Sequence, residues 1–356
     1  MKKTALIMAG GRGERFWPKS RKMLPKQFLS LTDDGKTMIQ LTVERILPLV
    51  DVSDIYIATN KDYLPLVKEQ LPDVPEENIL CEPVGRNTAP CIALGAALIS
   101  MKYDDALMMV LPSDHLIRYN SMYQSTLRDA CEVAEQGDNL VTVGITPDHA
   151  ETGYGYIKFS NEKTVGRAFA VEQFVEKPSL EVAKEYLAAD DYLWNSGMFL
   201  WKISSVMKRF TELMPEVHAG VMEIRDAYKN GNGEEVLQRI FPTFPSISID
   251  YGVMEKSQNI FTIPGAFGWD DVGSWLAVER IKKSNESGNI VNGNVITINT
   301  KNCIIQAEGK LIATVGLKDL IIVDTEDATL ICDKETTADI KKVLENLRIC
   351  NRNEYL

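Results

Sequence analysis

The sequence predicts an α/β protein with a mixed, mainly parallel sheet, followed by a small β-rich region that ends in a helix. Three observations support this fold class. Short apolar segments alternate with segments of helical periodicity through about residue 150, which is the pattern of βαβ units. Glycine-rich or polar turns follow three of the apolar segments. After residue 289 the chain changes to short β-branched segments at irregular intervals of roughly ten residues, which is typical of a small β-helix-like stack.

The first half of the chain alternates between strands and helices. An apolar run such as ALMMVL predicts a buried strand, and apolar residues at helical spacing predict a helix. The expected strands are 5–9, 54–58, 78–81, 106–111 and 140–143, and the expected helices are 37–49, 61–71, 89–101 and 119–135. In a sheet of this kind, ligands bind beyond the carboxyl ends of the strands. The polar turns that follow the first, third and fourth strands therefore mark the expected site.

The second half is mixed before it becomes all-β. Extended segments are expected at 153–159, 168–176 and 192–201, and helices at 203–214, 216–229, 234–240 and 273–283. The polar, glycine-containing SNESG separates this part from segments such as NVITIN and LIIVDT. We therefore expect a large domain at 1–283 and a β-rich domain at 284–356, which closes with a helix at 336–347. The β-rich domain contains no catalytic constellation, and we expect it to serve in assembly.

The composition is that of an ordinary globular protein and argues against several classes of function. The 356 residues carry a formal net charge of −11, which argues against nonspecific binding to nucleic acid. No apolar run approaches the roughly 20 residues of a membrane span. The short run after MKKT is interpreted as the first strand rather than as a signal peptide. The 6 cysteines and 3 histidines are scattered, so we expect no zinc site and no disulfides, but free thiols in the cytoplasm.

Residues 5–29, ALIMAGGRGERFWPKSRKMLPKQFL, are the most informative stretch. Gly10, Gly11 and Gly13 follow the first expected strand, and glycine allows backbone N–H groups to approach phosphate oxygens. Basic residues then follow closely in an otherwise acidic chain, which favours a polyanionic ligand over a plain turn with solvated charges. These residues are Arg15, Lys19, Arg21, Lys22 and Lys26. The stretch lacks the Lys-Ser/Thr ending of a P-loop and the G-x-G-x-x-G fingerprint of a dinucleotide site.

The segments AGGRGERFWP and LPKQFL resemble the signature loop of the sugar-nucleotide pyrophosphorylases, in the mannose-1-phosphate guanylyltransferase branch. Further matching motifs occur in order through residues 3–283. The tail is similar to the small β-rich C-terminal region of that family, and we expect no isomerase-like domain of the kind found in its longer bifunctional members. The resemblance implies a Rossmann-like (GT-A-like) nucleotidyltransferase domain. It also implies a Mg²⁺-dependent transfer of GMP from GTP to mannose 1-phosphate, with release of pyrophosphate and GDP-mannose.

Two turns beside expected secondary structure contain carboxylates, which are ligands suited to Mg²⁺. The motif LPSDH places Asp114 after a buried strand, and GWDDVGSW places Asp270 and Asp271 before an expected helix. A single aspartate in such a place is more often a turn or N-cap residue. The resemblance assigns the metal to Asp114 and Asp271, and it leaves Asp270 as the weaker candidate.

A second set of motifs matches the sugar half of the family's site. FVEKP contains Glu176 and Lys177, which in isolation would be an exposed charge pair. The resemblance places Glu176 on the sugar hydroxyls and Lys177 on the sugar phosphate. TGYGYI and WNSGMF add the remaining candidates, which are Gly153, Tyr154, Gly155 and Asn195. The two glycines would allow a sugar to lie close to the backbone.

The segment CEPVGRNTAP is the expected base-reading loop. Arg86, Asn87 and Thr88 precede an alanine-rich helix, so capping of that helix and contact with the nucleotide are both open. Glu82, which is followed by Pro83, is expected to accept hydrogen bonds from N1–H and the N2 amino group of guanine. A carboxylate suits this edge because it offers two acceptors and no donor. The alternative is a solvent-facing Glu82, with main-chain groups of the same loop reading the base.

In the implied reaction the sugar phosphate attacks the α-phosphorus of GTP in line, and no general base is needed because the nucleophile is already an anion. Gly10–Gly13 and Arg15 are expected to hold the triphosphate, Lys26 to neutralise the transferred phosphoryl, and Lys177 to bring up the attacking phosphate. The partners are then GTP and mannose 1-phosphate, with a homodimer as the expected assembly. A thymidylyl- or uridylyltransferase and a noncatalytic sugar-nucleotide sensor are the alternatives, and an NAD-dependent oxidoreductase fits worst.

Overall fold

The computed structural model describes residues 1–11 and 13–356. These residues form two compact units, each made of segments that are distant in sequence. The sheet unit comprises Met1–Gly10, Thr42–Ser113 and Ile117–Trp269, and the loop unit comprises Gly11–Leu41, Asp114–Leu116 and Asp270–Leu356. From the sequence we expect a boundary between two consecutive domains after residue 283. That boundary stays a prediction. The segments β5 (Leu116–Ile117), β11 (Trp269–Asp270) and α1 (Met38–Ile46) contain points at which the chain passes from one unit to the other.

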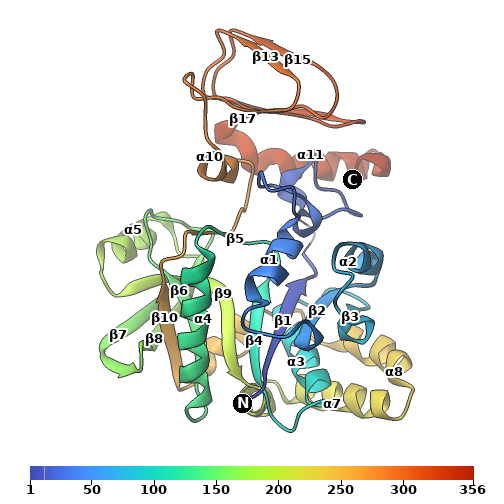
Figure 1. The fold of residues 1–356 in the computed structure, drawn as a ribbon, viewed down its shortest axis with the longest axis vertical. Coiled ribbons are helices and arrows are strands. Elements are labelled where there is room, and N and C mark those ends of the chain that lie inside the picture. The colour runs from blue at the N-terminus through green and yellow to red at the C-terminus, as the bar shows by residue number, and fades with distance from the viewer. Residues whose placement is uncertain (12) are drawn as a thin grey trace. The chain divides into compact units, whose positions relative to one another are not determined.

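The sheet unit is built on a nine-stranded mixed sheet with the order β3-β2-β1-β4-β9-β6-β10-β8-β7 (Figure 1). The strands are β1 (Lys3–Ala9), β2 (Ile55–Asn60), β3 (Ile79–Glu82), β4 (Leu107–Pro112), β6 (Leu140–Ile145), β7 (Gly155–Val165), β8 (Ala168–Glu176), β9 (Tyr192–Lys202) and β10 (Ile260–Gly265). The first four strands of the sheet are parallel, and β10 is parallel to β6. Strand β9 runs antiparallel to both β4 and β6 and so joins the two parallel groups. The predicted mixed sheet is confirmed, with parallel pairing concentrated in its first half.

Small side chains allow one helix to lie very close to this sheet. The helices of the sheet unit are α2 (Leu64–Gln70), α3 (Thr88–Ile99), α4 (Asn120–Glu135), α5 (Leu180–Ala188), α6 (Ile203–Leu213), α7 (Pro215–Lys229), α8 (Gly233–Ile240) and α9 (Ile249–Gly252). Helix α3 is buried along most of its length because its sequence, TAPCIALGAALI, is small and apolar. A Cβ atom on Gly95 would come within 2.6 Å of the Leu6 side chain on β1.

Within the described ranges, no helix combines the length and apolar character needed to span a bilayer.

The core of the loop unit combines the N-terminal glycine loop with the C-terminal strands. Phe16 and Trp17 share one apolar cluster with Trp275 and with side chains from the C-terminal region, among them Ile304, Ile321, Ile340 and Leu344. The rings of Phe16 and Trp275 have centroids 5.1 Å apart, and Trp275 Nε1 donates to the carbonyl of Trp17 at 3.0 Å. The glycine loop is therefore held in place by residues from the far end of the sequence. The short helix α10 (Ala277–Ile281) contributes Ala277 and Val278 to the same cluster.

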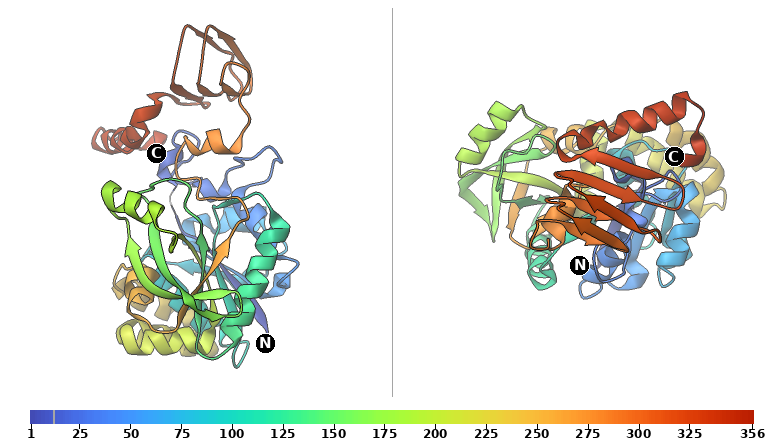
Figure 2. Two further views of the ribbon diagram at one scale, coloured as in Figure 1. Left: turned by 90° about the vertical axis from the view of Figure 1, so that its left-hand side faces the viewer. Right: turned by 90° about the horizontal axis from the view of Figure 1, so that it is seen from above.

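Short parallel strands form the C-terminal part of the loop unit (Figure 2). Strands β12 (Ile290–Asn292), β14 (Ile304–Gln306) and β16 (Leu320–Asp324) pair in parallel, β17 (Thr329–Asp333) is antiparallel to β16, and β13 (Val295–Ile298) is parallel to β15 (Ile312–Val315). This stacking confirms the predicted β-helix-like region. Helix α11 (Ile340–Ile349) follows, and it buries Ile340 and Leu344, which lie four residues apart on one face. The predicted terminal helix is thus also confirmed.

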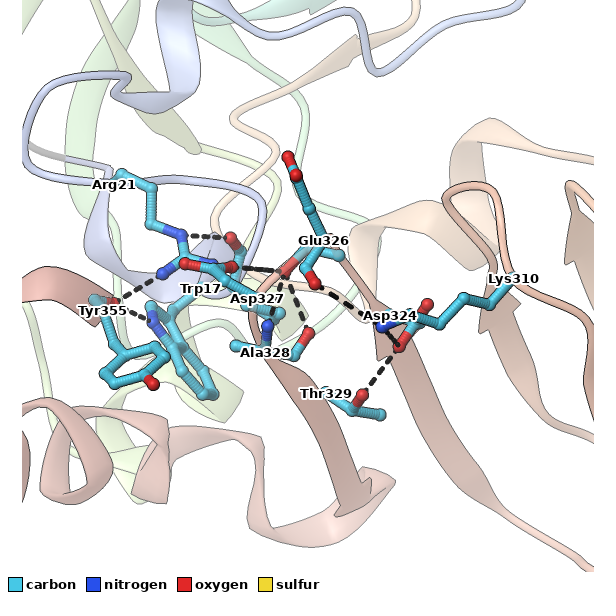
Figure 3. A network of polar contacts seen from close by, with 11 residues as sticks. Trp17, Arg21, Lys310, Asp324, Glu326, Asp327, Ala328, Thr329 and Tyr355 are labelled. Atoms are coloured by element: carbon cyan, nitrogen blue, oxygen red, sulfur yellow. Dashed lines mark hydrogen bonds and ion pairs between the residues drawn. The ribbon is translucent and has the colours of Figure 1, made fainter.

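A polar network joins the segment after the glycine loop to the C-terminal residues (Figure 3). Arg21 donates to the carbonyl of Tyr355 at 2.7 Å and pairs with Asp327 Oδ1 at 2.6 Å, in the turn between β16 and β17. Trp17 Nε1 donates to the same Tyr355 carbonyl at 2.7 Å. Hydrogen bonds typically contribute about 0.5–1.5 kcal/mol each, so several of them together hold this segment in place. Arg21, one of the basic residues that favoured a polyanionic ligand, is therefore occupied with structural contacts.

Candidate active site

Five predicted site residues line one cavity of the loop unit, and one of them is Gly13. The cavity has a volume of about 430 Å³, and Arg15, Lys26, Asp114 and Asp271 all lie on its wall. The complete lining is Gly13, Glu14, Arg15, Phe16, Lys26, Asp114, His115, Asp271, Val272, Gly273 and Lys341. We call this space the loop cavity. It brings together three predicted phosphate-binding residues, which are Gly13, Arg15 and Lys26, and both predicted metal ligands.

Lys26 connects three of the segments that build the loop cavity. It begins the short helix η2 (Lys26–Phe28), and its side chain is 7 % exposed. The ammonium group pairs with Asp114 Oδ2 at 2.7 Å and donates to the carbonyl oxygens of Asp271 at 2.7 Å and Val272 at 3.1 Å. A buried ammonium requires partners for its three protons, and this arrangement supplies them. Its predicted action on a transferred phosphoryl group stays a prediction.

Two unusual backbone conformations shape the wall around Lys26. Gly13 has a φ of 57°, and a Cβ atom there would come within 2.5 Å of the backbone nitrogen of Lys26. Val272 has a φ of 49°, which costs a β-branched residue about 1–3 kcal/mol. Two hydrogen bonds offset this cost, since Val272 N donates to Asp270 Oδ1 at 2.8 Å and its carbonyl accepts from Lys26. The strained turn places Asp271 on the cavity wall.

Asp114 is more accessible than its partner Lys26, with a side chain that is 36 % exposed. Burial alone would raise the pKa of this carboxyl, but the charge of Lys26 and the nearby His115 outweigh it and hold the pKa below its usual range. Burial lowers the pKa of His115, and the negative charge of Asp114 opposes that effect. The cavity therefore contains an ionised aspartate that solvent can reach.

The two adjacent aspartates of GWDDVGSW have different surroundings. Asp270 is 7 % exposed and pairs with Arg280 through both carboxylate oxygens, with Arg280 Nη2 3.0 Å from Oδ1. Asp271 lines the loop cavity, and its Oδ1 accepts a hydrogen bond from Gly273 N at 3.1 Å. The contacts of Asp270 are those of a structural residue. Asp271 is the carboxylate that a ligand in the cavity would meet.

In the sheet unit, strands β7, β8 and β9 bring three predicted sugar-binding residues together. Gly155 lies directly opposite Glu176, and a Cβ atom on Gly155 would come within 2.5 Å of Glu176 Oε2 and 3.5 Å of the Asn195 Cβ. Glycine at this position thus makes room for the carboxylate. Asn195 Nδ2 donates to Asp250 Oδ1 at 2.7 Å. Carboxylate and amide groups gathered in this way are suited to binding sugar hydroxyls.

Aromatic and acidic residues surround this cluster. Tyr154 packs edge-on against Trp194 and Trp269, with ring centroids 5.2 Å away in each case. Burial raises the pKa of Asp250, and the negative charge of Glu176 raises it further. The hydrogen bond from Asn195 lowers this pKa. The cluster therefore concentrates negative charge beside an aromatic wall.

Lys177 and Gly153 lie in more open positions. Lys177 follows β8 with a φ of 48°, its side chain is 64 % exposed, and its Nζ lies 3.3 Å from Glu176 Oε1. A lysine on a flexible stem can reach a phosphate as a point charge. The backbone N–H of Gly153 donates to Glu151 Oε1 at 2.7 Å. The roles of both residues toward a sugar phosphate stay predictions.

Glu82 is buried at the end of β3, with 6 % of its surface exposed. This burial excludes the alternative of a solvent-facing glutamate. Its Oε1 has no hydrogen-bond partner among the described residues, and a Cβ atom on Gly10 would lie 3.7 Å from its Oε2. Burial raises the pKa of Glu82 to about 7, against an opposing hydrogen bond with the Cys91 thiol. Glu82 is thus a buried acid with an unused acceptor beside the end of β1.

The rest of the predicted base-reading loop is bound to the protein itself. Arg86 donates to the carbonyl of Pro242, and Asn87 accepts from Thr88 N at 2.8 Å and so caps α3. Thr88 Oγ1 accepts from Ile249 N at 2.8 Å. The capping that the sequence left open is therefore present. Contact with a nucleotide stays a prediction for Pro83, Arg86, Asn87 and Thr88.

In the glycine loop, the carbonyl of Gly11 accepts a hydrogen bond from Gln27 Nε2 at 2.9 Å, and Arg12 lies outside the described residues.

The residues of these clusters that were not predicted from the sequence include His115, Asp250 and Lys341. His115 belongs to LPSDH, so the motif itself contained the signal. Asp250 and Lys341 lie far from the motifs in sequence, and only the fold places them beside other site residues. Lys341 belongs to a tail that was expected to lack any catalytic constellation, yet it lines the loop cavity.

Comparisons with known proteins find similar sequences and a similar structure over nearly the whole chain. The family model described as Nucleotidyl transferase matches residues 4–287, and the MannoseP isomerase/GMP-like beta-helix domain matches residues 293–347. The chain is 41% identical to the mannose-1-phosphate guanylyltransferase of Salmonella montevideo, over 99% of this chain and 75% of that protein. It is also 41% identical to the Escherichia coli (strain K12) enzyme of the same name, with 98% and 74% covered. The crystal structure of mannose-1-phosphate geranyltransferase from Thermus thermophilus is similar, with a TM-score of 0.88, 34% identity, and 98% of this chain and 100% of that chain covered.

The raised pKa of Glu82 predicts a pH-dependent effect on stability. Between its usual pKa of 4.5 and its folded value of about 7, the unfolded chain loses a proton that the folded protein retains. The contribution of Glu82 to stability is therefore present below pH 4.5 and is lost as the pH rises through 7. The loss amounts to about 3 kcal/mol. Glu82→Gln removes this pH dependence.

Urea unfolding of the wild type and of Glu82→Gln between about pH 4.5 and 8 measures this effect. The free energy of unfolding of Glu82→Gln should gain about 3 kcal/mol relative to the wild type across this range. Glu77→Gln, at an exposed position nearby, is the control and should follow the wild-type profile. A constant difference between Glu82→Gln and the wild type at all pH values would show that Glu82 keeps an ordinary pKa.

Proposed function

The chain belongs to the nucleotidyl transferase family and, within it, to the mannose-1-phosphate guanylyltransferases, and from that premise we propose that it transfers GMP from GTP to mannose 1-phosphate. The observation that carries the proposal is the loop cavity, in which Arg15, Lys26, Asp114 and Asp271 meet in a chain 41% identical to such an enzyme. Two cations and two carboxylates on one cavity wall suit a bound polyphosphate and its metal ion. The products are GDP-mannose and pyrophosphate.

The chemistry needs positioning and charge neutralisation more than proton transfer. An oxygen of mannose 1-phosphate forms a bond to the α-phosphorus of GTP, while the bond from that phosphorus to the bridging oxygen of the β-phosphate breaks. Pyrophosphate leaves with the electron pair of the broken bond. Arg15 and the N–H groups of the glycine loop are proposed to hold the triphosphate. Lys26, already fixed by Asp114, supplies positive charge close to the transferred phosphoryl.

The loop cavity also fits Mg²⁺. Among the described residues, no three His, Cys, Asp or Glu side chains form a metal-binding group, so a closed protein site of that kind is absent from this part of the chain. Mg²⁺ typically takes one or two carboxylates and completes its shell with substrate phosphates and water. Asp114, whose pKa is held low, and Asp271 are the proposed ligands. When bound there, Mg²⁺ would neutralise charge on the phosphates.

The sheet-unit clusters are proposed to bind the sugar phosphate and the base. Glu176 and Asn195 would accept or donate hydrogen bonds at the sugar hydroxyls, and Lys177 would draw in the attacking phosphate. Glu82 would bind guanine, because its buried Oε1 lacks a partner among the described residues and guanine offers two adjacent donors. Binding of guanine would then satisfy an acceptor that the protein leaves unused.

We place the protein in a homodimer that forms through the β-rich region. Ile296 and Ile298 on β13 and Val315 on β15 point outward from neighbouring strands and are 51, 53 and 66 % exposed. An apolar face of this kind favours an association partner, and a second copy is the commonest one. Light scattering at micromolar concentration tests this assembly, and a monomer would contradict it.

We place the reaction in the cytoplasm. All six cysteines, each of which lies in a described range, are free thiols. Disulfides are rare in reducing compartments, so the free thiols are consistent with this placement.

The proposed substrates can be tested by measuring pyrophosphate release with GTP, ITP, ATP, UTP and dTTP against several sugar 1-phosphates. We expect the pair of GTP and mannose 1-phosphate to give the highest kcat/KM. ITP lacks the N2 amino group, so the wild type should prefer GTP and Glu82→Gln should narrow the ratio of GTP to ITP. A higher kcat/KM with UTP or dTTP than with GTP would instead assign the chain to the alternative branch of the family. If the ratio of GTP to ITP is the same in Glu82→Gln as in the wild type, Glu82 does not bind the base.

The two neighbouring aspartates should respond differently to substitution. Asp271→Asn is expected to lower kcat by roughly 100-fold or more, because a carboxylate of the cavity is lost, while the melting temperature stays close to that of the wild type. Asp270→Asn weakens the pair between the buried Asp270 carboxylate and the half-exposed Arg280, and it should mainly lower the melting temperature. Activity assays over a Mg²⁺ titration, with melting curves, separate the two effects. If Asp271→Asn shows wild-type activity and an unchanged dependence on Mg²⁺, Asp271 is not a ligand of the metal.

A further inference from the structure

The C-terminal helix α11 contributes one basic side chain to the loop cavity, that of Lys341. Resting on the function proposed above, we propose that Lys341 binds the β- and γ-phosphates of the nucleotide donor, and hence the pyrophosphate that leaves. The β-rich region would then supply a catalytic residue in addition to its expected role in assembly.

The pairing of charges in the loop cavity supports this role. Lys26 is engaged by Asp114 and two carbonyl oxygens, and Glu14 is paired with Arg348 at 2.7 Å. Within the described ranges, no ion pair engages Arg15 or Lys341, although both line the cavity. These two side chains therefore add positive charge that no carboxylate of the described residues offsets, beside Lys26, whose charge is already partly offset by Asp114. A nucleoside triphosphate carries several negative charges, more than Arg15 alone can match.

The position of Lys341 is fixed by the packing of its helix. Its neighbour Ile340 and, one turn later, Leu344 are each 3 % exposed in the core of the loop unit. Arg348 pairs with Glu14, which lies beside Arg15 in the glycine loop. The backbone of α11 is thus anchored to the loop that carries Arg15, while the Lys341 side chain stays exposed and able to reach a ligand.

The next residue along the helix provides a contrast. Lys342 is also exposed, but it pairs with Asp339 at 2.9 Å and does not line the loop cavity. Adjacent residues of a helix point in directions about 100° apart, which explains how two neighbouring lysines come to face different surroundings. Lys342 therefore serves as a control of identical charge and similar exposure.

The leaving group is the part of the reaction that Lys341 suits best. As the bond to the α-phosphorus breaks, negative charge develops on the bridging oxygen of the pyrophosphate, and a cation beside it stabilises that charge. Lys341 shares its cavity with Arg15 and Gly13, the residues proposed to hold the triphosphate. Lys177, the lysine proposed for the sugar phosphate, belongs to the sheet unit.

Steady-state kinetics of Lys341→Ala in both directions test the proposal. The KM for GTP and, in the reverse direction, the KM for pyrophosphate should rise by about 10- to 100-fold, as expected for loss of a charge-assisted contact. The KM for mannose 1-phosphate should stay within about twofold, and Lys341→Arg should restore part of the loss. Lys342→Ala should match the wild type. Because Lys341 is exposed, the melting temperature of Lys341→Ala should not change.

Unchanged KM values for GTP and pyrophosphate in Lys341→Ala, or equal changes in Lys342→Ala, would overturn the proposal. Direct titration of wild type, Lys341→Ala and Lys342→Ala with pyrophosphate by calorimetry tests it without relying on turnover. If the wild type binds pyrophosphate more tightly than Lys341→Ala but shows no activity with GTP and mannose 1-phosphate, the proposed function fails while the Lys341 site stands. Equal pyrophosphate affinity of all three proteins would contradict the Lys341 site itself.

Discussion

The contacts of the buried Lys26 ammonium are the interaction on which the candidate active site depends. This one group binds the Asp114 carboxylate and the carbonyls of Asp271 and Val272, so it holds the turn after β4 and the turn after β11 to the glycine loop. Only Lys26 is buried in this pair, and a partly buried charge-assisted hydrogen bond of this kind typically contributes about 1.5–3 kcal/mol. The strained φ of Val272 and the need for glycine at position 13 follow from the same arrangement.

The C-terminal region takes part in this arrangement through the core of the loop unit. Phe16, Trp17 and Trp275 pack in one cluster with side chains of the β-helix-like strands and of α11. Arg21 and Trp17 are tied to the Tyr355 carbonyl, and Arg348 is paired with Glu14. A region that the sequence suggested for assembly therefore also holds the phosphate-binding segment in place, which explains how Lys341 comes to line the loop cavity.

The sequence predicted those features that depend on local patterns. The strands β1 to β4, the alanine-rich α3 and the short parallel strands after residue 289 follow from apolar runs and periodicity. The motifs also named both aspartates that line the cavity. Strand β10 and helix α5 were missed, because their sequences are short and gain their stability from neighbours that lie far away in the chain. The contacts of Lys26 and the place of Lys341 on the cavity wall could not be predicted either, because they also depend on segments that are distant in the sequence. A motif shows that a residue type is present, whereas its partners are set by the packing of distant segments.

The central claim is that Lys26 and Asp114 are energetically coupled in the unliganded protein, and a double-mutant cycle measures this coupling most directly. The free energies of unfolding of the wild type, Lys26→Met, Asp114→Asn and the double variant would be determined with urea at neutral pH. We predict a coupling free energy of about 1.5–3 kcal/mol, as expected for a partly buried charge-assisted hydrogen bond. A coupling within about 0.5 kcal/mol of zero would mean that the two residues act independently, and it would contradict the account of how this site is built.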